Sequence, residues 1–333
     1  MTGFTVRNLK VFFKDRTSVF FSLLSVFIII GLYVLFLGDV WITSLKDLTG
    51  VRYLMDSWIM AGLLTVTSVT TTMGAYGIMV EDKAKKINKD FTASPIKTRS
   101  LVGGYVAGAI IVGIVMSLIT CVLAEIYIIS NGGRLMDIFT FIKVLGLIIL
   151  STVTNSSIVF FLVSFLKSTN AFSTASAIIG TIIGFLTGIY LPIGQLPDGV
   201  QWVVKVFPVS HAAVLFRQVM MADPFSKTFA DAPAEAAENF EKVMGIKLFF
   251  GDTAVTPLAS MLILIATAAV FYILAVLNLS RKSRYPRRHA MCFCRFRTFC
   301  YWVTKNGCEK SQPFNLLKNT LCGGNGQSFC SRF

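Results

Sequence analysis

Six apolar stretches, each long enough to cross the hydrocarbon core of a bilayer, most constrain what this sequence can form. A transmembrane helix needs roughly 20 predominantly apolar residues. Apolar residues make up 54% of the chain and charged residues only 14%, a balance unlike that of soluble domains. We therefore predict an all-α membrane protein with a six-span transmembrane domain over residues 17–280. The six expected spans are residues 17–37, 58–80, 101–128, 138–166, 171–191 and 256–279.

The segment before the first span, residues 1–16, reads MTGFTVRNLKVFFKDR and has the mixture of basic and apolar residues typical of an amphipathic helix. It runs directly into the first span without a small-residue cleavage site. We expect an interfacial amphipathic helix, followed by a first span that is retained as a signal anchor.

Lys and Arg residues set the expected orientation, because cytoplasmic segments carry an excess of them near span ends. They gather before the first span and after the second, fourth and sixth spans, whereas the intervening segments are poor in bases and hold acids. The sequence thus predicts a multi-pass protein of the cell (plasma) membrane with both termini in the cytoplasm.

Residues 281–333 form a separate basic, Cys-rich tail. They hold eleven Lys and Arg, a single acid, Glu309, and six of the seven Cys residues, so the tail carries +10 of the formal net charge of +14. In the cytoplasm these thiols stay reduced, and their spacing matches no zinc pattern. We expect a poorly ordered tail attracted to anionic lipid or to a protein partner, not to nucleic acid. An appended or misframed coding end is the alternative.

The charged segment between the second and third spans, residues 81–95, reads EDKAKKINKDFTASP. Ala84, Ile87 and Phe91 fall on one helical face, lysines cover the other, and the Ser-Pro step at Pro95 ends the helix. One interpretation is a solvated connector with snorkelling lysines. The other is a docking helix, which the length favours because adjacent antiparallel spans need a far shorter connection.

A proline-broken segment, residues 192–255, precedes the sixth span. Apolar positions on both sides of Pro208 recur at helical spacing, so we expect two half-length re-entrant helices packed against protein. Asp231 is placed to cap an Ala- and Glu-rich helix that ends near Gly245. The helix pair is interpreted either as a gate or as a peripheral lid without gating.

Polar side chains inside spans are costly unless they face a partner or a cavity. Thr65, Ser68 and Thr72 share one face of the second span, and Asn155 lies near the middle of the fourth. Such groups either hydrogen-bond between helices or line a substrate path. The candidate substrate-path residues are Thr65, Ser68, Thr72, Thr154, Asn155, Ser173 and Ser176.

Two charges near the same ends of the third and fourth spans, Glu125 and Lys143, are expected to form a partly buried ion pair. The chain has no GxxxxGK[ST] loop and therefore no phosphate cradle for ATP. Its only histidines, His211 and His289, are predicted on opposite sides of the membrane, which argues against a histidine metal site and His-dependent catalysis. We expect no catalytic residues, no metal and no cofactor bound by the chain.

The N-terminal helix RNLKVFFKDR, the six spans, the charged helix ending in Ser-Pro and the segment GIYLPIGQLPDGVQWVVKVFPVSHAAVLFRQ resemble the membrane subunit of ABC-2 type ATP-binding cassette exporters. The resemblance extends from residue 1 to about residue 285. Two places depart from the family pattern: Lys86-Ile87 stands where many members have Gly-Thr, and Ser25-Val26 stands where the first span often has a proline.

This resemblance implies that ATP and Mg²⁺ are bound by a separate ABC nucleotide-binding ATPase subunit, and that a second permease subunit, identical or different, completes the transport path. It also implies roles for residues that match the family pattern. The expected ATPase-coupling residues are Lys83, Lys86, Ile87, Asp90, Phe91 and Pro95. The expected outer-gate residues are Pro192, Pro197, Phe207, Pro208 and Arg217.

The function expected from the resemblance is export of an amphipathic substrate, such as a drug, lipid, glycolipid or hydrophobic peptide, out of the cytoplasm or inner leaflet. The alternative is a self-contained secondary transporter or channel without an ATPase partner. That class relies on ionisable groups inside the membrane, and the expected spans offer mainly hydroxyl groups.

Overall fold

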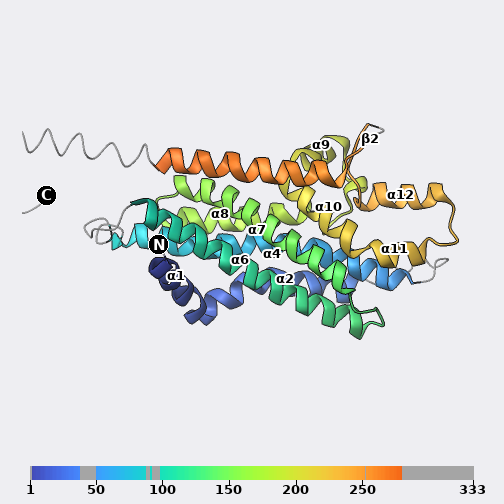
Figure 1. The fold of residues 1–333 in the computed structure, drawn as a ribbon, viewed down its shortest axis with the longest axis horizontal. Coiled ribbons are helices and arrows are strands. Elements are labelled where there is room, and N and C mark those ends of the chain that lie inside the picture. The colour runs from blue at the N-terminus through green and yellow to red at the C-terminus, as the bar shows by residue number, and fades with distance from the viewer. Residues whose placement is uncertain (1, 38–49, 88–90, 92–97, 252, 280–333) are drawn as a thin grey trace, which may run out of the picture. The chain divides into compact units, whose positions relative to one another are not determined.

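The computed structural model describes residues 2–37, 50–87, 91, 98–251 and 253–279. These residues are almost entirely helical (Figure 1). Residues Met1–Leu277 form one compact unit, and the second unit, Asn278–Phe333, lies outside the described residues except for its first two positions. The predicted tail, residues 281–333, is therefore not described.

Six helices in the described part are long and apolar enough to cross a membrane, which confirms the six predicted spans. Each begins and ends within a few residues of the expected position, except that the second is much longer and the fifth ends earlier. The helices are α2 (Arg16–Leu32, continued by a π-helical segment, Tyr33–Leu37), α4 (Val51–Ala84), α6 (Thr98–Ser130), α7 (Ile138–Phe165), α8 (Thr169–Leu186) and the last helix, Pro257–Leu279.

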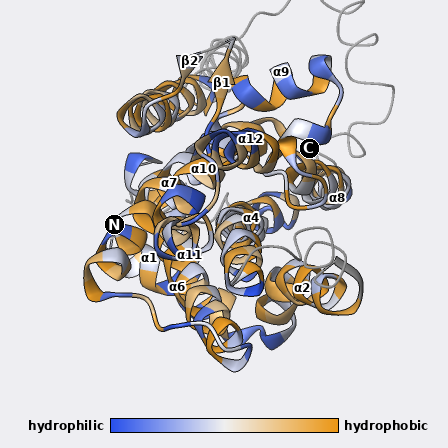
Figure 2. Ribbon diagram, turned by 90° about the vertical axis from the view of Figure 1, so that its right-hand side faces the viewer, coloured by the Kyte–Doolittle hydropathy of each residue, from blue (hydrophilic) through white to orange (hydrophobic). Residues whose placement is uncertain are grey.

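Helix α4 is the central element, with α2, α6, α7, α8 and α10 packed around it (Figure 2). Its side chains are buried along nearly the whole helix, including the large rings of Trp58 and Tyr76. The tight approach of α6 depends on Gly113, where an added Cβ would lie 2.6 Å from Thr152 and 2.8 Å from Thr72. Burial of α4 on all sides makes it the element through which the two ends of the unit are joined.

Helix α1 (Thr2–Lys14) forms where the amphipathic helix was predicted. It packs on α6, α2 and α4 through Thr5, Asn8 and Phe12, while Val6 and Phe13 on the other face are 47% and 40% exposed. The protein-facing side of this helix thus holds two polar residues and one large ring, and its exposed side includes apolar residues that are left for the membrane surface.

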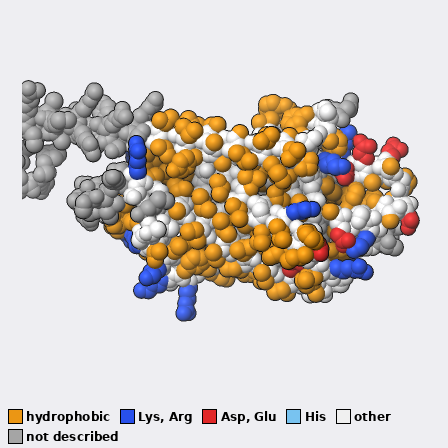
Figure 3. Space-filling model, in the orientation of Figure 1, with side chains coloured by type: hydrophobic (Ala, Val, Ile, Leu, Met, Phe, Trp, Pro, Cys, Tyr) orange, Lys and Arg blue, Asp and Glu red, His pale blue; other side chains and the backbone are white. Residues whose placement is uncertain are grey.

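A wide apolar band separates the charged ends of the unit on the face shown in Figure 3. On this face, Lys and Arg lie at both ends, whereas Asp and Glu gather at the end that carries α11 and α12. Large apolar side chains on this outer surface include Leu258 at 72% and Leu262 at 65% exposed. Exposed apolar surface of this extent requires lipid or another protein to cover it.

The segment before the last helix forms a small folded region of its own. It contains a 3₁₀ turn, η2 (Ile193–Gln195), then α9 (Asp198–Val206) and α10 (Pro208–Met220), which meet at an angle of 84°. Its core is a cluster of Leu186, Ile193, Leu196, Val204, Val214 and Leu248. The helix pair broken at Pro208 is therefore present, as predicted. The remaining elements are α11 (Ala222–Thr228), α12 (Ala234–Met244) and the antiparallel strands β1 (Phe249–Phe250) and β2 (Thr253–Ala254).

Two sequence predictions are wrong. Asp231 does not cap α12, because the helix begins later, at Ala234, with Pro233 in the capping position; its end at Gly245, in the left-handed conformation, is as expected. Glu125 and Lys143 do not form an ion pair. Instead Glu125 accepts a hydrogen bond from the backbone N–H of Met136 at 3.1 Å, and Lys143 is exposed. The loop between α6 and α7 folds back onto the carboxylate and takes the place expected for the lysine.

Candidate functional site

One buried carboxylate joins the C-terminal end of α4 to α1 and α6. Asp82, which is 3% exposed, accepts two hydrogen bonds from Arg7: Nη1–Oδ2 at 2.6 Å and Nη2–Oδ1 at 3.0 Å. Tyr105 of α6 donates its hydroxyl to Asp82 Oδ2 at 2.6 Å. The hydrogen bond to Asp82 raises the pKa of Arg7, which keeps the guanidinium charged. Bidentate Arg–carboxylate contacts are strong and directional, so this group fixes the angle at which α1 meets α4.

Aromatic rings pack beside the ion pair. The Phe4 ring lies edge-on to Phe91 and Tyr105, with centroid distances of 5.2 Å and 4.9 Å. Arg7 Cζ lies 5.8 Å and 5.6 Å from the ring centroids of Phe4 and Phe91. Gly104 permits this approach, because an added Cβ there would lie 2.6 Å from the Phe4 ring. We call these contacts the α1 clamp: Phe4, Arg7, Asp82, Phe91 and Tyr105.

The expected ATPase-coupling residues follow directly from the clamp. Lys83 belongs to the last turn of α4, because that helix runs on to Ala84, whereas the sequence suggested a separate helix from Lys83. The chain then turns at Lys86, whose φ of 62° lies in the left-handed region that few residues other than glycine adopt. Ile87 and Phe91 are helical and partly buried. Asp90 and Pro95 lie outside the described residues.

Five of the predicted substrate-path residues are buried between the helices of the subunit. Asn155 donates through Nδ2 to Ser68 Oγ at 2.6 Å and to Ser151 Oγ at 3.2 Å. The hydroxyl of Thr72 donates to the backbone of its own helix. Each of the five is at most 1% exposed; they are Thr65, Ser68, Thr72, Thr154 and Asn155. In this conformation all five are closed to solvent, and Ser68 and Asn155 join α4 to α7.

The other two predicted path residues lie on α8, which is mostly exposed along its length. Ser173 is exposed, and Ser176 is half-buried with a buried Oγ that has no hydrogen-bond partner. Gly180 follows on the same helix with nothing within 4 Å of an added Cβ. The exposed surface of α8 thus combines polar and small residues with the large apolar side chains Ile178, Ile182 and Phe185.

Arg217, predicted at the outer gate, is completely buried in α10. It donates through Nη2 to the carbonyl of Thr187 at 2.8 Å and through Nη1 to the carbonyl of Gly245 at 3.3 Å. Thr187 and Gly245 are the C-caps of α8 and α12. The Cζ atom of Arg217 lies 4.4 Å from the ring centroid of Trp58. No carboxylate of the described residues pairs with it. Two negative helix ends and an aromatic face take the place of a counter-ion.

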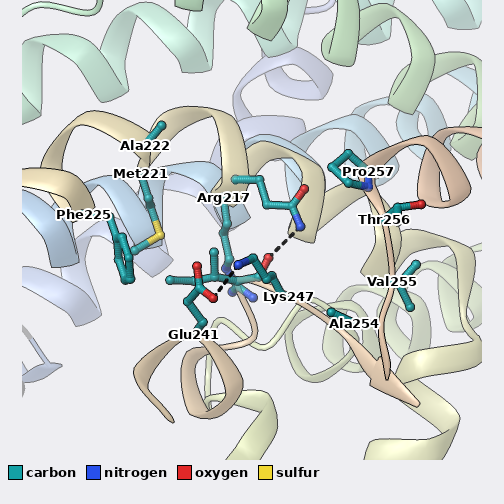
Figure 4. Close-up of a pocket in the computed structure, with 12 residues that line it drawn as sticks. Arg217, Met221, Ala222, Phe225, Glu241, Lys247, Ala254, Val255, Thr256 and Pro257 are labelled. Atoms are coloured by element: carbon teal, nitrogen blue, oxygen red, sulfur yellow. Dashed lines mark hydrogen bonds and ion pairs between the residues drawn. The ribbon is translucent and has the colours of Figure 1, made fainter. Parts of the chain in front are cut away.

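The other predicted gate residues lie where the backbone changes direction. Pro192 precedes η2, Pro197 precedes α9, and Phe207 and Pro208 form the break between α9 and α10. Phe207 is 36% exposed at this corner. A hollow of about 440 Å³ lies beside α10 and is lined by residues of α11, α12, β2 and the start of the last helix (Figure 4). Lys247 and Glu241, which both line this hollow, form an ion pair of 2.6 Å.

A model of the family described as "ABC-2 family transporter protein" matches residues 43–277, well over half of the chain. The chain belongs to this family. No curated protein matches it at a significant level. The ABC-2 permease is thus a multi-pass membrane component of an ABC transporter, and membership in the family implies association with an ABC ATPase component and no catalytic role of its own. In the described part of the permease, no three His, Cys, Asp or Glu side chains are placed to hold a metal ion.

The permease also contains interactions that sequence reasoning missed. Arg7 was counted only as a basic residue, and Asp82 only as part of a charged segment, because their separation of 75 residues gives no local signal. Trp58 donates Nε1–H to the carbonyl of Met244 at 2.8 Å and also stacks on Arg217, yet a tryptophan at a span end is usually an interface anchor. The lone acids at the two ends of α4, Asp56 and Asp82, are the sequence signal that could have indicated these contacts, since an acid inside a span needs a partner.

Proposed function

We propose that this permease is the membrane-spanning subunit of an ABC exporter whose ATP is hydrolysed by separate nucleotide-binding subunits, and that it moves an amphipathic substrate out of the cytoplasm or inner leaflet. The observation that carries the proposal is the α1 clamp. It ties the expected coupling residue Phe91 to α1, α4 and α6 through Phe4, Arg7 and Asp82. A displacement of the coupling segment by an ATPase is therefore passed to three helices at once.

The charge distribution supports a cytoplasmic location for the clamp. Lys10 and Lys14 belong to the same helix as Arg7, and Arg16 begins the next helix, whereas the acids on the face in Figure 3 gather at the end that carries α11 and α12. Because cytoplasmic segments carry an excess of bases, this distribution supports a cytoplasmic location of α1 and the N-terminus in a plasma-membrane protein.

The exposed surface of α8 supports a second permease subunit. Ser173 is exposed on a spanning helix that the rest of the subunit largely leaves uncovered, and Gly180 on the same helix leaves room for a close approach. A second copy placed against this face would cover it and leave a transport path between the two subunits. A Ser173→Cys variant should form a disulfide-linked dimer in native membranes under mild oxidation, and a Leu262→Cys variant on the exposed face of the last helix serves as the control.

The central test is purification of the permease from its native membrane, followed by identification of co-purifying proteins and an ATPase assay. We expect an ABC ATPase subunit to co-purify, and Phe91→Ala to reduce substrate-stimulated ATP hydrolysis without loss of membrane insertion. Phe250→Ala, at an exposed phenylalanine in β1, is the matched control. A permease that purifies alone and still transports its substrate would instead support a secondary transporter or channel.

A further inference from the structure

A second cavity lies at the end of the spanning helices away from the α1 clamp. Its volume is about 420 Å³, and it is bounded by the start of α4, the end of α6, the loop into α7, and the junction of α10 with α11. Charged side chains of both signs line it, unlike the mainly apolar surroundings of the rest of the spans. The charged residues are Glu125, Arg134, Asp137, Asp223 and Lys227.

Two of these charges, Glu125 and Arg134, neither form an ion pair nor cap a helix within the described residues. Asp223 pairs with Lys227 at 2.6 Å, and Asp137 caps α7 by accepting from the N–H of Phe139. Glu125 uses one oxygen to accept from the backbone and forms no ion pair, and Arg134 forms none either, within the described residues. The cavity therefore presents one acceptor carboxylate and one donor guanidinium to whatever occupies it.

Both charges line this one cavity, together with Tyr53 of α4. Its hydroxyl also donates to Asp223 Oδ2 at 3.4 Å. A ligand that satisfies both free charges must itself carry a positive and a negative group a few bonds apart.

The cavity lies at the level of lipid headgroups. It is formed by the ends of three spanning helices, and the apolar side chains beside it are among the most exposed of the chain. Leu135 is 72%, Ile138 61% and Phe139 70% exposed. Side chains of this kind are stable when they insert among acyl chains, which places the neighbouring charged cavity at the membrane interface.

We propose that this cavity binds the zwitterionic headgroup of an aminophospholipid, with its ammonium on Glu125, its phosphate on Arg134, and its acyl chains against Leu135 and Phe139. A primary ammonium fits because the free oxygen of Glu125 requires a hydrogen-bond donor, and a quaternary choline group has none. A purely anionic headgroup fits poorly, because three carboxylates and two cations line the cavity.

The test uses the full chain purified in detergent and supplied with phosphatidylethanolamine, phosphatidylcholine or phosphatidylglycerol of identical acyl chains, with retained lipid counted by native mass spectrometry. We expect phosphatidylethanolamine to be retained about tenfold more strongly than phosphatidylcholine, the effect of one charge-assisted hydrogen bond. Glu125→Gln should remove most of this preference, whereas Arg134→Gln should weaken the retention of all three lipids, because each of them carries the phosphate. Glu238→Gln on α12 and Arg16→Gln are the matched controls, since both residues are exposed and outside the cavity.

Arg134 is exposed, so its replacement leaves folding intact and the test remains decisive even where Glu125→Gln lowers the yield. Equal retention of the three lipids, stronger retention of phosphatidylglycerol, or unchanged lipid retention in Arg134→Gln would overturn the proposal. Glycerophosphoethanolamine, which has the headgroup without acyl chains, should compete only weakly. Competition as strong as that of the lipid would show that the ligand is a soluble zwitterion and would overturn the assignment to a lipid.

Discussion

Arg7 and Arg217 attach their elements to opposite halves of the same central helix, α4, but they do so in different ways. Arg7 has a side chain that is 33% exposed and pairs with the carboxylate of Asp82. Arg217 is completely buried and is held by backbone carbonyls and the Trp58 ring. One is a partly hydrated arginine paired with a buried carboxylate, and the other is a desolvated cation at two helix ends.

This difference indicates which end of the unit can move. Water reaches Arg7, so its contact with Asp82 can break and re-form at a modest free-energy cost. Arg217 has no water to replace the carbonyls of Thr187 and Gly245, so separating α8, α10 and α12 costs much more. We therefore expect the α1 clamp to rearrange during transport and the elements around Arg217 to move together as one body.

Replacement of Arg217 should have the largest effect. Arg217→Met keeps the volume but leaves the carbonyls of Thr187 and Gly245 without donors, which should cost about 3–5 kcal/mol of stability. This loss of stability is measured by thermal unfolding in detergent, followed by size-exclusion chromatography. Arg217→Lys restores the charge without the two-pronged geometry and should recover only part of the loss. Near-normal stability of Arg217→Met would show that the buried cation is not what holds these helices.

Neutralisation of the clamp should have a smaller effect on stability and a larger one on coupling. Asp82→Asn removes the charge but keeps a hydrogen-bond acceptor for Tyr105, which should cost about 2–3 kcal/mol because Arg7 remains partly hydrated. Stimulated ATPase activity of the complex should fall further than stability explains. Arg7→Gln should add little to Asp82→Asn, since the two residues act as one pair; additive effects in the double variant would contradict the clamp.

The aromatic partner of Arg217 gives a finer test of the buried end. Trp58→Phe removes the hydrogen bond to the Met244 carbonyl and weakens the cation–π contact while keeping a ring, so we expect a loss of about 1–2 kcal/mol. Unfolding of the detergent-solubilised protein measures it, with Trp202→Phe on the exposed face of α9 as the control. A loss as large as that of Arg217→Met would mean that the ring, not the carbonyls, compensates the charge.

The smallest effect is expected at a fully hydrated charge near the clamp. Asp15 caps α2, and hydrogen bonds from Ser18 and the N–H of Thr17 lower its pKa below the ordinary value of 3.8. A lowered pKa means that the cap stabilises the fold at neutral pH and that this contribution is lost as the pH falls through the lowered value. The thermal unfolding midpoint of the Asp15→Ala variant should lie below that of the native chain at pH 7, and this difference should shrink in acid. A constant difference would show that the charge is not involved.

Local chemistry explains how much of the fold was predictable. Hydrophobic length located all six spans, and Pro208 located the bend between α9 and α10, because both signals act within a few residues along the chain. The predicted contact of Glu125 with Lys143 failed for a related reason. It assumed that neighbouring opposite charges pair, whereas the returning loop supplies the N–H of Met136 instead.

The sequence by itself determined that this chain is a six-span membrane protein with an N-terminal amphipathic helix and without an ATP-binding loop of its own, since hydropathy and motif spacing are local properties. Only the tertiary structure decided that Arg7 meets Asp82, that Arg217 lies on the ends of α8 and α12, and that Ser68 of α4 meets Asn155. These contacts join residues distant along the chain. Their energies arise from desolvation and geometry, which exist only once the helices have packed.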